Sequence, residues 1–181
     1  LSLYYEGKYQ EAMALIKEVI AKQEDALGEN ATDTLTSRNG LAMCYAVTGE
    51  SDQALELYQD IVNRRREQQG EDHTSTLMAV NNLATAHQAN GDYDEALALF
   101  QKNLADRQRL QGEGHRLTLL ALDRLGSIYK AMGEFQKAIP LYEEALKKRQ
   151  AKLGPNHPHS LESMSGLGFA FRDAGRLDEA V

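Results

Sequence analysis

Histidine is the residue type whose spacing in this chain most suggests chemistry. His73, His115 and His157 recur at intervals of 42 residues, and His159 stands two positions after the last of them. Zinc needs its ligands at roughly 2 Å, whereas equivalent positions in packed helical repeats are separated by at least about 8–10 Å. We therefore predict that the repeated histidines support loops and that the chain has no metal site. The pair formed by His157 and His159 could hold a metal only adventitiously.

The other reactive residue types form no catalytic pattern. Cys44 is the single cysteine, and it lies inside the apolar stretch 41–47, which predicts a buried structural thiol rather than a reactive one. Gly112 and Gly114 are not followed by the lysine of a phosphate-binding loop. No Ser-His-Asp or Cys-His arrangement is suggested. We predict that the protein is not an enzyme and uses no cofactor.

Composition and charge narrow the class of protein further. The 181 residues are 42% hydrophobic and 26% charged, with a net charge of −7, which is typical of a folded soluble domain. The longest apolar run has seven residues, far short of the roughly 20 that span a bilayer. An acidic chain is also a poor general ligand for nucleic acid or anionic membrane. We expect a cytoplasmic protein that binds neither nucleic acid nor membrane.

Glycines repeat along the chain and determine the pattern of elements. One series keeps a 42-residue interval at Gly7, Gly49, Gly91, Gly133 and Gly175. A second series keeps the same interval at Gly28, Gly70, Gly112 and Gly154. A fixed period of 20 to 50 residues indicates a solenoid or repeat array, and such arrays usually act through an extended surface.

Between the glycines, the apolar residues follow the spacing of an α-helix, so we predict an all-α fold. Each repeat should hold two helices. The first helices are expected near 32–48, 74–90, 116–132 and 158–174. The second helices are expected near 8–27, 51–69, 93–111 and 135–153. Small residues at the helix crossings, namely Ala12, Ala54, Ala96, Ala138 and Ala180, should allow close packing.

The helix ends also have sequence signals. We expect Gly49, Gly91 and Gly133 to close the first helices in the left-handed conformation, and Gly70, Gly112 and Gly154 to do the same for the second helices. We also expect Ser or Thr to cap the starts of the first helices. Pro140 should cause a mild bend in its helix but no break.

The period predicts one repeat domain over residues 1–181. Its units are about 1–31 (partial), 32–73, 74–115, 116–157 and 158–181 (partial). Because the chain stops within a repeat, we expect apolar residues to be partly bared at that end: Leu167, Phe169, Phe171, Leu177 and Val181. End-to-end self-association through the truncated repeats would cover them.

One repeat carries a recognisable motif. Leu125-Gly126-x2-Tyr129, Gly133 and Ala138-x3-Tyr142 resemble the tetratricopeptide repeat. The longer period, and Gly-x-x-His-x-x-Thr/Ser-Leu between the units, are similar to the kinesin light chain type of this repeat. That motif occupies 70–77, 112–119 and 154–161, whereas Ala31 replaces its histidine in the first instance. The resemblance covers the whole chain and implies a right-handed α-solenoid of antiparallel helix pairs.

The resemblance also implies a site. In tetratricopeptide proteins the first helices line a concave face that receives a peptide. Carried over position by position, the peptide-binding residues are Asn39, Met43, Met78, Asn81, Thr85, Gln88, Asp123, Arg124, Ser127, Lys130, Phe169 and Arg172. The N-terminal half of this face is largely apolar, and polar and cationic groups enter later along the chain. Kinesin light chain repeats bind aromatic-acidic peptides, so the resemblance makes such a peptide the expected partner.

Two interpretations of these residues remain open. Asn39 and Asn81 could clamp a peptide backbone or bridge neighbouring repeats. Lys130 and Arg172 could receive a carboxylate or lie on a solvated surface without a partner. Asp123, on the same face, would repel an acidic ligand or pair with those cations.

The sequence thus favours a non-catalytic protein–protein interaction scaffold that binds a peptide or a partner protein on the concave face. The alternative is a structural or regulatory repeat region that packs against another domain of a larger signalling protein.

Overall fold

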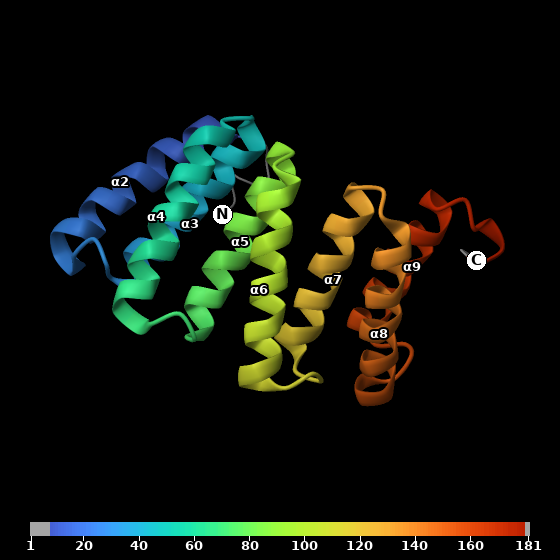
Figure 1. Ribbon diagram of the computed structural model, residues 1–181. Helices are drawn as coiled ribbons and strands as arrows, with labels where there is room; N and C mark the ends of the chain where they lie inside the picture. The colour runs from blue at the N-terminus through green and yellow to red at the C-terminus, as the bar shows by residue number, and fades with distance from the viewer. Residues whose placement is uncertain (1–7, 180–181) are drawn as a thin grey trace. The chain divides into compact units, whose positions relative to one another are not determined.

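The protein is described by a computed structural model that covers residues 8–179, apart from the side chain of Leu177 (Figure 1). Within that range it contains eight α-helices and one short 3-10 helix, and no strand. The predicted all-α class is therefore confirmed.

The helices fall where the glycine period predicts them, to within one residue at each end. The first helices of the repeats are α3 (Thr32–Thr48), α5 (Thr74–Asn90), α7 (Arg116–Ala131) and α9 (Pro158–Asp173). The second helices are α2 (Tyr9–Leu27), α4 (Ser51–Gln69), α6 (Tyr93–Gln111) and α8 (Phe135–Leu153). The 3-10 helix η1 (Leu177–Glu179) follows α9. Pro140 lies inside α8, which continues past it as expected.

The chain divides into two compact units, Leu1–Asp92 and Tyr93–Val181. In the first unit α2 packs on α3, α3 on α4 and α4 on α5. In the second unit α6 packs on α7, α7 on α8 and α8 on α9, and α7 also touches α9. Within each unit, a helix thus packs mainly against its neighbours in sequence, and in Figure 1 consecutive helices of one unit run in opposite directions.

Small residues allow the helices of a pair to approach closely. Ala12, Ala54, Ala96 and Ala138 are all buried, as predicted for the helix crossings, while Ala180 lies outside the described residues. The buried ring of Tyr142 sits between two glycines. A Cβ on Gly126 would lie 3.0 Å from Tyr142 Cζ, and one on Gly166 would lie 3.2 Å from Tyr142 Cε1. The glycine of the repeat motif therefore makes room for this aromatic ring.

The glycines close the two kinds of helix in different ways. Gly49 and Gly91 have φ of 85° and 90° with ψ near zero, which is the predicted left-handed conformation. Gly28, Gly70 and Gly154 also have positive φ, but their ψ values are 157°, 169° and 160°. The prediction of a left-handed cap was therefore wrong for Gly70 and Gly154. Each N–H still bonds the carbonyl four residues back, while the extended ψ carries the chain on to the next repeat.

The repeated histidines cap the first helices, which corrects the prediction of Ser or Thr caps. Nδ1 of His73 accepts the backbone N–H of Ser75 at 3.2 Å, and His115 and His157 make the same bond to the residue two positions on. Imidazole supplies the acceptor here, as a hydroxyl or carboxylate does at most caps. Ala31 stands at the corresponding position of α3, which has no side-chain cap.

The Thr or Ser of the same motif has another task. Thr34, Thr76 and Ser160 each donate a hydrogen bond to the carbonyl of the glycine six residues earlier, at 2.8–3.0 Å. Thr118 donates instead to the carbonyl of Arg107 at 3.3 Å. These bonds tie the end of each second helix to the start of the next first helix.

Three other predictions concern buried or apolar residues. Cys44 is buried, as predicted, and burial raises the pKa of its thiol. Phe169 is exposed and Leu167 half-buried, but Phe171 is buried and its ring is covered by Arg176 at 4.8 Å. The expectation that Phe171 is exposed was therefore wrong. Val181 and the side chain of Leu177 lie outside the part of the chain that the structure describes. No helix in the described part is long and apolar enough to cross a bilayer.

Candidate functional site

In the first unit, the predicted site residues lie on α3 and α5. Asn82 Nδ2 donates to Asn39 Oδ1 at 2.8 Å, and Asn39 Nδ2 reaches Met43 Sδ at 3.7 Å. Asn39 thus bridges two neighbouring first helices, which is the structural interpretation left open above. Asn82 was missed from the sequence, although it directly follows the predicted Asn81.

The same unit exposes two methionines. Met43 and Met78 have 43% and 53% of their surface exposed. Thr85 donates its hydroxyl to the carbonyl of Asn81 at 2.9 Å, and Asn81 and Gln88 are half-buried. Exposed methionines are flexible and polarizable, and they suit surfaces that adapt to a partner.

In the second unit, an aromatic ring and two cations come together on α7 and α9. Phe169 is 50% exposed. Lys130 Nζ lies 5.8 Å from the centre of its ring and Arg172 Cζ lies 5.1 Å from it, both within the range of a cation–π contact. Asp173 accepts a hydrogen bond from Arg172 Nη2 at 2.7 Å and lies 3.9 Å from Lys130 Nζ. We call Lys130, Phe169, Arg172 and Asp173 the cationic aromatic cluster.

The acidic residue predicted for this face is used elsewhere. Asp123 pairs with Arg149, and burial raises the pKa of its carboxyl although Arg149 acts to lower it. Arg149 also donates to the hydroxyl of Ser163. Asp123 therefore does not neutralise Lys130 or Arg172. That task falls to Asp173, which sequence reasoning did not select although it adjoins Arg172.

The two remaining predicted residues lie on α7 beside Tyr142. Arg124 is half-buried, and its Nε has no hydrogen-bond partner among the described residues. Ser127 is half-buried and forms a hydrogen bond with Tyr142. Burial raises the pKa of Tyr142 to about 12, with the charge of Asp123 acting in the same direction.

A row of buried arginines on the second helices was missed entirely. Arg65, Arg107 and Arg149 keep the 42-residue interval of the glycines, and all three are buried. Burial is the main cause that lowers the pKa of Arg65 and of Arg107. The interval itself was the available signal, but arginine is ordinarily expected at the surface.

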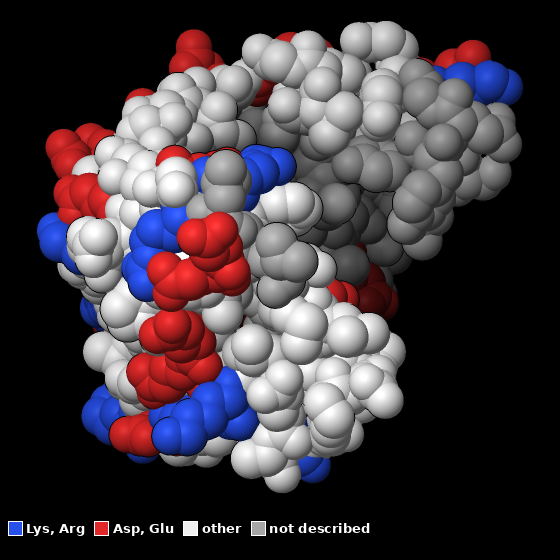
Figure 2. Space-filling model, turned by 90° about the vertical axis from the view of Figure 1, so that its right-hand side faces the viewer, with Lys and Arg blue, Asp and Glu red and all other residues white. Residues whose placement is uncertain are grey.

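On the face shown in Figure 2, charge is distributed in patches. On the side of the molecule in Figure 2, acidic side chains form a band with basic side chains at its two ends, beside an area with neither. This face therefore does not carry the basic stripe typical of nucleic-acid binding. The described part also contains no group of three or more His, Cys, Asp or Glu side chains that could hold a metal ion.

Comparison with known proteins agrees with this architecture. The tetratricopeptide repeat family model matches residues 1–67, 75–151 and 120–181. The comparison with curated proteins found no match. A crystal structure of nearly identical TPR-like repeats of a kinesin light chain-like protein from Podosopora anserina is 30% identical, with a TM-score of 0.81. The alignment covers 99% of this chain and 85% of that one.

Two further structures are similar. A variant of the same Podosopora anserina repeats is 29% identical with a TM-score of 0.83, over 99% of this chain and 84% of that one. BtubC (BKLC) from P. vanneervenii shares the fold at 24% identity and a TM-score of 0.79, over 98% of this chain and 71% of that one. The chain therefore belongs to the tetratricopeptide repeat family, with repeats like those of kinesin light chain-like proteins.

Proposed function

We propose that the protein is a non-catalytic scaffold that binds a peptide or partner protein on the exposed face of its first helices, the face that the sequence predicted as the binding face. In the second unit the bound segment would carry an aromatic residue with acidic neighbours. The observation that supports this most directly is the half-exposed ring of Phe169 between Lys130 and Arg172. The single buried thiol fits a reducing compartment such as the cytoplasm.

The cationic aromatic cluster offers two kinds of contact in one place. The free area of the Phe169 ring can stack with an aromatic side chain. Arg172 is 59% exposed and bonds only to the adjacent Asp173 among the described residues. A peptide carboxylate could take that position with bidentate geometry. Aromatic and arginine side chains are also the residue types that most often dominate binding energy at interfaces.

A direct binding measurement tests the proposal. The titration uses fluorescence anisotropy of a labelled peptide with one tryptophan flanked by glutamates, and the same peptide with lysines in place of the glutamates. We expect the acidic peptide to bind, and Phe169→Ala and Arg172→Glu each to weaken it by about tenfold or more. Lys147→Glu is the control, because it makes the same charge change on an exposed position of α8.

Equal affinity of wild type and both variants would place the peptide elsewhere and contradict the proposed site. Failure of every peptide to bind the folded protein would instead favour a structural or regulatory repeat region that packs against another domain.

A further inference from the structure

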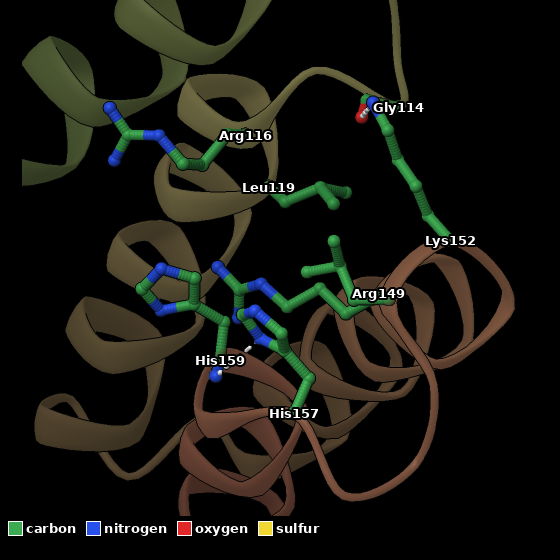
Figure 3. Close-up of a pocket in the computed structure, with 8 residues that line it drawn as sticks. Gly114, Arg116, Leu119, Arg149, Lys152, His157 and His159 are labelled. Carbon is green, nitrogen blue, oxygen red and sulfur yellow. Dashed lines mark hydrogen bonds between the residues drawn. The ribbon is translucent and has the colours of Figure 1, made fainter.

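A pocket of about 230 Å³ lies within the second unit, away from the cationic aromatic cluster (Figure 3). It forms where the turn before α7, the end of α8 and the start of α9 meet. His157 caps the start of α9, whereas Phe169 lies 12 residues further on, or roughly 18 Å at the rise of an α-helix. The pocket and the cluster are therefore separate surfaces.

The lining combines an apolar centre with basic side chains. Leu119 and Leu153 supply the apolar part, and the lining contains no acidic residue. Lys152 extends along one wall to Gly114, whereas the guanidinium of Arg116 points away from the other lining residues, as Figure 3 shows. The chain as a whole has a net charge of −7, whereas the lining of this pocket is basic.

Two of the basic groups have hydrogen-bond donors left over. Lys152 Nζ donates to the carbonyl of Gly114 at 3.3 Å, and an ammonium group has three donors in all. His157 Nδ1 accepts the N–H of His159 at 3.2 Å, so a neutral ring carries its proton on Nε2 and can donate from there.

The acidic groups near the pocket already have ion-pair or hydrogen-bond partners. Asp123 pairs with Arg149, which is only 4% exposed and is fixed in place. Glu162 lies 3.0 Å from His159 Nδ1, and Glu113 pairs with Lys148. In the described part of the chain, Lys152 and Arg116 form no ion pair. The charge of Lys152, which lies along the pocket wall, is therefore available to an external anion.

Comparison with an earlier repeat shows which residues of the pocket are common to the repeats and which are particular to this one. Leu119, Arg149 and His157 have Leu35, Arg65 and His73 at the equivalent positions of the first unit. These three residue types belong to the repeat itself and need no ligand to explain them.

The basic residues at the mouth are not part of that framework. Arg116, Lys152 and His159 correspond to Thr32, Gln68 and Ser75. Gln68 Nε2 donates to the carbonyl of Asn30 at 2.7 Å, the same backbone bond that Lys152 makes to Gly114. A neutral amide is thus sufficient for the structural bond, and the charge of Lys152 has no structural use of its own.

The size of the pocket limits the ligand. Pockets for drug-sized molecules usually measure about 300–1,000 Å³, so this one is suited to a single amino-acid residue. A C-terminal residue carries an apolar side chain and a carboxylate on the same Cα, whereas an internal acidic sequence needs two residues for that combination. We propose that the pocket binds the C-terminal residue of a partner protein, with a leucine-like side chain against Leu119 and Leu153 and its carboxylate on Lys152.

The test uses a fluorescein-labelled hexapeptide Gly-Ser-Gly-Ser-Ala-Leu, titrated with the whole chain, as the free acid and as the C-terminal amide. We expect the acid to bind about tenfold more tightly than the amide, since only the acid offers a charge-assisted bond. Lys152→Gln and Leu153→Gln introduce the residues of the earlier repeat, and each should weaken binding of the free-acid peptide by about tenfold. Lys147→Gln removes the same charge from an exposed site outside the pocket and should have no effect.

Several outcomes would overturn the proposal. They are equal affinity for acid and amide, wild-type affinity in both pocket variants, or no binding by a protein that circular dichroism shows to be folded. Displacement of the peptide by an equal concentration of 4-methylpentanoate would assign the pocket to a free small carboxylate instead. Phe169→Ala should leave this titration unchanged, so its result is distinguishable from that of the peptide site on the first helices.

Discussion

At the scale of single residues, Tyr142 shows why a motif position is constrained to glycine. Its ring is held from two sides, by Gly126 of its own repeat and by Gly166 of the next. A ring confined in this way cannot move from a new methyl group on one side without approaching the other. Gly40, in the middle of α3, has much more room, because its nearest neighbour is a terminal carbon of Ile16 at 4.0 Å.

The two glycines should therefore respond oppositely to alanine. Gly126→Ala overpacks the contact with Tyr142 and should lower the free energy of unfolding by about 1–2 kcal/mol, even after the gain in helix propensity. Gly40→Ala gains propensity without a clash and should raise it by up to about 1 kcal/mol. Urea denaturation of both variants measures this, and equal effects would show that the Tyr142 contact does not restrict Gly126.

Burial of Tyr142 also predicts a loss of stability in alkali. Its pKa is raised to about 12 in the folded protein, against about 10 in an unfolded chain. The stabilising effect is therefore complete below pH 10 and is lost as pH rises from about 10 towards 12, by at most about 3 kcal/mol. Urea titrations at pH 8 and pH 11 should show a smaller fall for Tyr142→Phe than for wild type. The exposed Tyr93→Phe is the control, and an equal fall in all three proteins would contradict the prediction.

At the scale of elements, the turn between repeats depends on two side chains with separate tasks. The histidine caps the next helix through Nδ1, and the Thr or Ser three positions later closes the turn onto the preceding chain. The spacing indicated that the histidines belong to the loops. It did not show which atom accepts a bond, because Ser and Thr are the more frequent caps and they stand in the same segment.

The first repeat provides a natural comparison for the histidine cap. His73→Ala removes an acceptor and should destabilise the protein by about 0.5–2 kcal/mol. Ala31→His introduces the residue that the other repeats use and should stabilise α3 by up to about 1 kcal/mol. Both are measured by chemical denaturation at pH 8, where an ordinary imidazole is neutral. If Ala31→His does not stabilise the protein and His73→Ala does not destabilise it, the histidine caps contribute nothing to stability.

At the scale of the whole molecule, packing between sequence neighbours means that stability is local. Arrays of this kind behave approximately as sums of repeat and nearest-neighbour terms. Thr34→Val removes a hydroxyl bond in the first unit, and Ser160→Ala removes its counterpart in the second.

Hydrogen exchange can detect this locality. We expect Thr34→Val to speed amide exchange in α2 and α3 while α8 and α9 keep their wild-type rates, and Ser160→Ala to give the reverse pattern. A uniform change across both units in either variant would show instead that the chain opens as one cooperative body.

The fold was predictable because one interval recurs in many residues at once. Glycine, alanine and aromatic positions all repeat together, so an error at one position could not change the helix boundaries. The site was less predictable, because its chemistry depends on the residues that break the repeat. Asp173 and Asn82 supply contacts, but neither is among the positions carried over from the family. Asp123 is among them, yet it pairs with Arg149 on a second helix. Such pairings depend on side-chain directions that spacing alone does not give.

The bonds between second and first helices have a consequence for how such a chain can change in length. Each connection uses only residues of two adjoining repeats, such as Thr76 with Gly70 or Ser160 with Gly154. Duplication or loss of one complete period in the gene would therefore join compatible ends again, whereas an insertion of another length would leave a glycine carbonyl without its hydroxyl. Homologous chains should accordingly differ in length by whole repeats. Arg116, Lys152 and His159 take no part in these bonds, so their positions are free to diverge in each new copy.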